Sequence, residues 1–214
     1  MAERHESAQA GQRFARRSLL RFAGIGLVAL SGKPDQALAR ELAGSVEEIK
    51  GDAFAEAESE RRKLENAAPV FVADEVSTGS ASRLAIRLGK DTVIRLGELA
   101  HLTIDRFVEN AGGELTLKSG PLLFDRTAGA EPRPLRIRSS FGLIAVRGTR
   151  FFAGPSAGVF GVFVTRGSVV VAAGGREVVV GDGEGTNIAH PGDTPTAPAP
   201  WKPPRIDAAL ESVL

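Results

Sequence analysis

Residues 168–180 read SVVVAAGGREVVV, two runs rich in valine and alanine that are separated by Gly174-Gly175. Two such runs joined by two glycines are typical of a β-hairpin, because glycine readily takes the positive φ angles that a two-residue loop needs. Similar short runs occur along the chain before this hairpin. They predict further strands at residues 69–73, 83–88, 92–96, 101–104, 114–118, 135–138, 142–146, 149–153 and 160–165.

Several of these runs alternate between apolar and other residues, which is the pattern of a half-buried strand. Leu84, Ile86 and Leu88 fall on one side of their run, and Leu115 and Leu117 do the same in theirs. Glycine, which suits tight turns, accounts for 25 of the 214 residues. Many short strands separated by glycine turns predict an all-β fold, a sandwich, roll or barrel, rather than a parallel sheet linked by helices.

Two segments do not follow the strand pattern. Residues 57–66 are strongly charged and have no apolar face, which favours a surface loop or a single helical turn. Residues 189–214 hold six of the chain's 12 prolines, which favours an extended tail, followed by a short amphipathic helix with Ile206, Leu210 and Val213 on one side. We expect Trp201, the only tryptophan, to dock this tail on the domain; the alternative is that its ring binds a partner.

The N-terminal segment has the three parts of an export signal. Basic residues that include Arg16, Arg17 and Arg21 precede an apolar run at residues 22–30, and the small-residue pattern of Ala37 and Ala39 follows. The arginine pair, together with Leu20 and Arg21, resembles the twin-arginine (Tat) version of such a signal. The apolar run is too short for a bilayer span, which needs about 20 residues.

These features predict three parts of the chain: a signal peptide at 1–39, cleaved after Ala39, a β domain at 40–188, and the tail at 189–214. We therefore expect a periplasmic protein, with an inner-membrane anchor only if the signal stays uncleaved. Residues 1–39 hold six Lys or Arg and three Asp or Glu, so the remaining 21 basic and 23 acidic residues leave a net charge of −2. That balance argues against nucleic acid as the partner, since phosphate binding calls for a concentrated basic surface.

Few residues in the chain suggest catalysis or metal binding. The chain has no cysteine, and His101 and His190 are the only histidines after the signal. Asp182, Glu184 and Asn187 resemble an oxygen-rich calcium loop, but their spacing matches no calcium motif and favours a glycine-rich turn. We therefore expect no metal, no cofactor and no enzymatic activity. A hydrolase whose carboxylates meet only in space is the remaining enzymatic alternative.

The body of the chain resembles a FecR-type domain over residues 46–188. Three stretches carry the resemblance: PVFVADEVSTG at 69–79, SRLAIRLGKDTVIRLGELAHL at 82–102 and SFGLIAVRGTRF at 140–151. The last of these contains the family's most specific segment, V-R-G-T-x-F, made by Val146, Arg147, Gly148, Thr149 and Phe151.

The resemblance implies two packed antiparallel sheets, or a β-roll, of about 10–12 short strands. It also implies a non-catalytic sensing or interaction role in the periplasm, with an unidentified envelope protein as the partner. A cell-wall or glycan-binding module is the alternative binding function. The transmembrane regulators of this family carry a cytoplasmic domain that binds a sigma factor, and the 15 residues before Arg16 are too few for such a domain.

The V-R-G-T-x-F segment has two interpretations. As a binding element, Arg147, Thr149 and Arg150 form a basic spot that recognises a partner or an anionic ligand. As a structural element, Gly148 permits a tight backbone while Val146 and Phe151 pack in the core. The sequence favours the structural interpretation, because arginines are mostly solvated and branched or aromatic residues are mostly buried.

Overall fold

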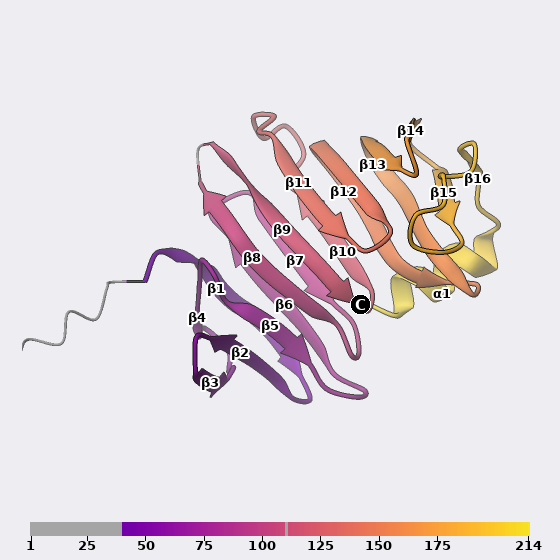
Figure 1. Ribbon diagram of the computed structural model, residues 1–214. Coiled ribbons are helices and arrows are strands. Elements are labelled where there is room, and N and C mark those ends of the chain that lie inside the picture. Colours follow the sequence, from indigo (N-terminus) through magenta and orange to yellow (C-terminus); the bar gives the residue numbers. More distant parts are fainter. Residues whose placement is uncertain (1–39, 110) are drawn as a thin grey trace, which may run out of the picture. The chain divides into compact units, whose positions relative to one another are not determined.

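The computed structural model describes residues 40–109 and 111–214, which form sixteen strands and one short helix (Figure 1). The all-β prediction is confirmed. The strands are β1 (Leu42–Lys50), β2 (Ala53–Ala57), β3 (Glu60–Lys63), β4 (Pro69–Phe71), β5 (Glu75–Thr78), β6 (Arg83–Leu88), β7 (Thr92–Leu96), β8 (His101–Val108), β9 (Gly112–Ser119), β10 (Leu122–Arg126), β11 (Leu135–Ser139), β12 (Gly142–Ser156), β13 (Val159–Ala173), β14 (Arg176–Val180), β15 (Glu184–Ile188) and β16 (Ala199–Pro200). The helix is α1 (Pro203–Glu211).

The strands form two layers that share β12 and β13. The first layer runs β3-β2-β5-β8-β9-β11 and continues through the first half of β12, the second half of β13 and β14. The second layer runs β4-β1-β6-β7-β10 and continues through the second half of β12, the first half of β13, β15 and β16. In Figure 1, β8, β9 and β11 lie in front of β6, β7 and β10. All paired strands are antiparallel except β9 and β11, which are parallel.

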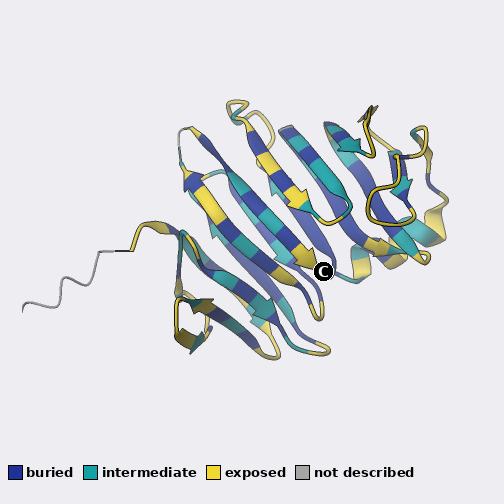
Figure 2. Cartoon of the chain, viewed as in Figure 1, coloured by how far each residue is buried: buried dark blue, intermediate teal, exposed yellow. Residues whose placement is uncertain are grey.

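One apolar core fills the space between the layers. Its members come from both sides: Ile104 and Leu115 from the first layer, Ile94 and Phe124 from the second. Figure 2 shows the resulting alternation of buried and exposed residues along the strands. Because successive side chains of a strand point to opposite faces, every second residue is left on an outer surface of the domain.

The long hairpin β12–β13 bends from one layer into the other. The pairing register of the two strands shifts between Arg147 and Arg150, at the bend. Gly148 has a φ of 59° there and Gly167, on the facing strand, has a φ of 85°. Non-glycine residues avoid such angles, so the two glycines allow both strands to turn together. Beyond the bend, the Phe151 ring stacks on Phe124 with 5.4 Å between ring centroids.

A second apolar cluster covers the outer surface of the second layer. Trp201 and α1 pack there on outward residues of β10, β12 and β13, and the cluster consists of Leu123, Phe152, Phe163, Trp201, Ala209 and Val213 with Ile206 and Leu210 at its edge. Trp201 is 8% exposed and stacks on Phe163 at 5.1 Å. The guanidinium carbon of Arg205 lies over the Trp201 indole, 3.5 Å from the ring centroid. Trp201 therefore docks the tail on the domain, as expected.

Asp74 anchors the start of the described chain. Its side chain is fully buried and accepts hydrogen bonds from Arg40, Arg62 and the backbone N–H of Phe71. Buried carboxylates need such partners, because an unpaired buried charge is costly. Arg40 is thus fixed to the domain at the entry to β1.

Two parts of the described chain differ from the sequence expectations. Residues 57–66 include the end of β2 and the edge strand β3, joined by a turn at 58–59, so the prediction of a loop or a single helical turn was wrong for the strand residues. β3 pairs with β2 alone and its sequence, Glu-Arg-Arg-Lys, is charged on both faces, so it lacks the alternation that identifies a strand. Strands β5, β10, β15 and β16 were also not expected, and β15 begins at Glu184, where a glycine-rich turn was predicted. In the described residues, no helix is long and apolar enough to cross a membrane.

Replacing Gly161 with alanine tests how the tail is held. A Cβ at this position would lie 2.6 Å from the Trp201 ring, so the ring must shift. We expect Gly161→Ala to cost about 1–3 kcal/mol of unfolding free energy, as overpacking does, and to move the Trp201 emission to longer wavelength. Because the chain has one tryptophan and no tyrosine, intrinsic fluorescence reports on this contact alone.

Leu115→Ala is the matched control for this measurement. Leu115 belongs to the core between the layers, so its truncation should lower stability by about 2–5 kcal/mol and leave the emission of the folded state unchanged. An unchanged emission in Gly161→Ala would contradict the docking of Trp201 described above.

Candidate interaction surface

The outer surface of the first layer carries no helix among the described residues. We call the outward side chains of β8, β9, β11, β12, β13 and β14 the open face. Their alignment follows directly from the strand pairing, because paired residues on one face lie side by side. In the first row the paired residues are Arg106, Glu114, Arg136, Ala145, Val170 and Val179. In the second row they are Thr116, Arg138, Leu143, Ala172 and Glu177.

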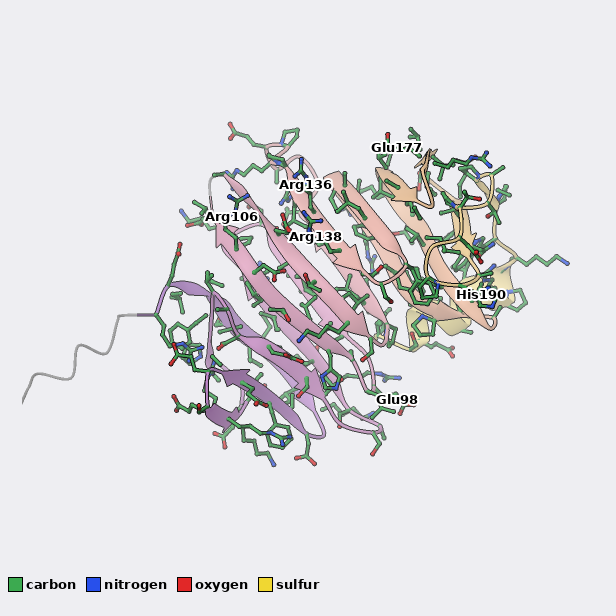
Figure 3. The ribbon with its side chains drawn as sticks, in the orientation of Figure 1. Glu98, Arg106, Arg136, Arg138, Glu177 and His190 are labelled. Atoms are coloured by element: carbon green, nitrogen blue, oxygen red, sulfur yellow. The ribbon has the colours of Figure 1, made fainter. Side chains whose placement is uncertain are left out.

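One half of the open face is charged. Arg106 on β8 and Arg136 and Arg138 on β11 are exposed and lie on the viewer's side in Figure 3. Glu114, which lies on β9 between these strands, is hydrogen-bonded by Arg138. This bond holds the pKa of Glu114 below its ordinary value, and the nearby charges of Arg136 and Arg106 act in the same direction. Three guanidinium groups thus surround one paired carboxylate.

A hollow of about 370 Å³ opens at the end of this charged half. Its lining includes Arg106 on β8 and Arg136 on β11, which flank Glu114 on the intervening strand β9. Gly112 also lines the hollow, and the Pro134 carbonyl oxygen occupies the position that a side chain at Gly112 would need. Neither Arg106 nor Arg136 forms an ion pair with a described residue, so both guanidinium groups are available to a ligand in the hollow.

The other half of the open face is apolar. Ala145, Val170 and Val179 continue the row that begins with Arg106, and Leu143 and Ala172 lie beside them. Val179 is 65% exposed and belongs to β14, the last strand on this side of the first layer. An exposed apolar surface with a polar border is typical of a protein-binding site.

The family-motif residues lie at the bend rather than on the open face. Val146, Thr149 and Phe151 are buried, and Gly148 provides the bend itself. Arg147 pairs with Ser168 through the backbone of the hairpin. These positions fit the structural interpretation of the motif.

Arg150 lies on the outer surface of the second layer and shares a carboxylate with a facing arginine. Its Nε is 3.5 Å from Asp125, and Arg166 donates a hydrogen bond of 2.8 Å to the other oxygen of the same carboxylate. The basic spot expected around Arg150 is therefore partly neutralised.

The other candidate residues are used within the fold. Glu184 accepts a hydrogen bond from the backbone of Gly181, and Asn187 accepts one from Arg205. His101 lies 3.5 Å from Glu75, and His190 lies 3.0 Å from Asp193. In residues 40–109 and 111–214, no three His, Cys, Asp or Glu side chains come together as metal ligands. The export-signal residues Arg16, Arg17, Leu20, Arg21, Ala37 and Ala39 lie outside the described residues.

Residues 74–170 match the family model described as FecR protein. The FecR-matching range begins at the buried Asp74 and ends at Val170, so it contains the bend and the charged half of the open face. A search of curated proteins finds no match.

Two crystal structures, at 1.65 and 2.50 Å resolution, have a similar fold. Both are of a "putative anti-sigma factor" from Parabacteroides distasonis ATCC 8503, with a TM-score of 0.53 and 15% sequence identity. The matched part covers 64% of this chain and 64% and 63% of the two chains of known structure. At this identity the likeness concerns the fold, and the chain spans about two thirds or less of the length of its structural neighbours.

Titration of Glu114 tests the charge arrangement of the open face. We expect its carboxyl group, followed by carbon-13 NMR, to protonate below the ordinary value of 4.5, and Arg138→Gln to raise this pKa toward 4.5. Arg106→Gln should raise it less, because Arg138 supplies the hydrogen bond. Since the folded-state pKa is lowered, this group stabilises the fold at neutral pH and the contribution is lost as the pH falls through the lowered value. A pKa of 4.5 in the parent protein would contradict the arrangement.

Proposed function

We propose that this chain is a non-enzymatic sensory or interaction domain of the bacterial periplasm, which binds an envelope protein as part of a signalling system. The FecR match over residues 74–170, which includes Arg106, Glu114, Arg136 and Arg138, is the observation that carries the proposal. The similar fold of a protein described as a "putative anti-sigma factor" supports a regulatory role.

The two outer surfaces of the domain differ in a way that supports protein binding. On the second layer, Trp201 and α1 cover the apolar residues. On the first layer, the apolar row ending at Val179 is accessible and has arginines at its other end. Such a mixed surface matches the anatomy of protein interfaces, where an apolar centre is bordered by polar groups.

A protein partner fits this surface better than a cell-wall glycan. Sugar sites usually present exposed aromatic rings, but the large exposed apolar residues in the described chain are Leu42, Leu99, Val108, Val179 and Leu214. Trp201, the only tryptophan of the chain, is buried against Phe152 and Phe163.

Export by the twin-arginine route is the second part of the proposal. A cut after Ala39 leaves Arg40 at the new N-terminus, and the contact of Arg40 with the buried Asp74 is on the retained side. A cut after Ala39 would therefore keep this contact intact.

The partner is tested by site-specific crosslinking in the bacterial host. We expect a photoreactive phenylalanine analogue at Val179 or at Ala145 to give adducts with an envelope protein, because both positions lie on the open face. The same analogue at exposed Glu60 on β3 or at Lys202 in the tail is the control. Adducts that form equally from all four positions, or from none, would count against a protein partner at the open face.

Export is tested with the arginine pair. In a host with a working twin-arginine pathway, we expect a periplasmic product that begins at Arg40, identified by mass spectrometry. Arg16→Lys combined with Arg17→Lys should prevent its appearance in the periplasm. A cytoplasmic product that retains Met1 would refute the proposed location and would leave the crosslinking test unaffected.

A further inference from the structure

We infer that the open face recognises an acidic segment of a partner protein, whose carboxylate enters the hollow between Arg106 and Arg136 and whose following apolar side chains lie on Val170 and Val179. The inference rests on the proposed protein-binding function and adds the chemistry of the partner.

The arginines of the hollow differ from those on the other outer surface. On the second layer, Arg87 pairs with Glu47 and Arg95 with Glu48. On the open face, Arg138 forms an ion pair with Glu114. None of the described acidic side chains forms an ion pair with Arg106 or Arg136. Because both arginines flank the same glutamate in one row, the hollow has an excess of positive charge. A ligand carboxylate would relieve that excess.

The shape of the hollow suits an anionic side chain. Its volume of about 370 Å³ is more than a carboxylate occupies. Guanidinium groups bind carboxylates through paired hydrogen bonds, and such charge-assisted bonds are the stronger ones in proteins. Arg106 on β8 and Arg136 on β11 flank Glu114 of β9, so one carboxylate placed between the two arginines can receive donors from both.

The apolar half of the open face determines how many residues separate the acidic residue of the ligand from its apolar residues. Neighbouring strands lie about 4.8 Å apart, so the row from β9 to β12 spans about 10 Å and the row to β14 about 19 Å. An extended chain advances about 3.3 Å per residue. Side chains of an extended segment that face the same way are two residues apart, so the residues four and six positions after the acidic residue share its face. A segment that crosses the strands therefore places apolar side chains on Val170, about 14 Å from β9, and on Val179, about 19 Å from β9.

The apolar half also favours a protein segment over other anions. Phosphate or a lipid headgroup could use Arg106 and Arg136, but neither has side chains to cover Val170 and Val179. Nucleic acid is disfavoured as well, because Asp105 and Glu177 lie on the same face and would repel its successive phosphates, whereas a single carboxylate meets only the two arginines.

The test uses a synthetic peptide and the chain as it exists after residue 39. The probe is acetyl-Glu-Ser-Ser-Ser-Val-Ser-Val-amide with a fluorophore, and its partner probe carries Gln in place of Glu. We expect the Glu probe to bind about tenfold more tightly, which corresponds to about 1.4 kcal/mol. In Arg106→Gln/Arg136→Gln the Glu probe should lose this advantage while the Gln probe is unaffected.

Arg87→Gln/Arg95→Gln is the matched control, since it removes two arginines from the other outer surface and should leave both probes unchanged. Amide NMR signals of β12 to β14 should shift with either probe. Equal affinity for the Glu and Gln probes, equal loss in the control variant, or no binding of the Glu probe would overturn the inference. Tighter binding of inorganic phosphate, or of vesicles containing phosphatidylglycerol, would assign the hollow to a different anion.

Failure of this inference can be told apart from failure of the proposed function. One outcome is that crosslinks form from Val179 and Ala145 while the peptide probes do not distinguish Glu from Gln. In that case the proposal of a protein partner stands, and the inference that the partner offers an acidic segment is refuted. If no crosslinks form, protein binding at this face fails whatever the probes do.

Discussion

The bend in the β12–β13 hairpin is the constraint on which both layers depend. Each of these strands contributes one half to the first layer and the other half to the second, so the two sheets are covalently continuous at this corner. The bend requires positive φ angles at Gly148 and Gly167, on facing strands. Immediately before it Val146 enters the core from the first layer, and immediately after it Phe151 enters from the second. The spacing of V-R-G-T-x-F follows from this geometry, because an apolar residue must precede and follow the glycine at the positions that point inward.

The same corner determines which outer surface is accessible. Beyond the bend, β12 and β13 carry Phe152 and Phe163 outward on the second layer, and these rings would be exposed without the tail. Trp201 covers them, and Gly161 leaves room for its ring beside Phe163. The tail is thus part of the folded domain rather than a linker. Because its apolar residues are used there, the face available for a partner is that of the first layer.

Periodicity in the sequence was enough to predict most strands but not the arrangement of residues on the open face. The runs at 83–88 and 92–96, for example, are strands with those bounds. One face of each strand is buried, and the alternation of apolar residues in the sequence reflects this burial. The charged strand β3 has no buried face, so its sequence shows no alternation of apolar and polar residues. The alternation of Leu135, Arg136, Ile137 and Arg138 in the sequence also indicates that both arginines point outward. It could not bring Arg106 beside them, since that depends on the parallel pairing of β9 with β11, which are not consecutive strands.

Stability and recognition are carried by different residues of the same strands. On β11, Leu135 and Ile137 fill the core, while Arg136 and Arg138 point to the open face. The same division holds on β13, where Val169 and Val171 are buried and Val170 is partly accessible. An outward side chain can therefore change without leaving a cavity, which is the main cost of altering an inward one. A fold built around the bend can in this way carry different charged and apolar side chains on its outer surface. In this chain the open face carries an arginine-lined hollow beside a row of valines.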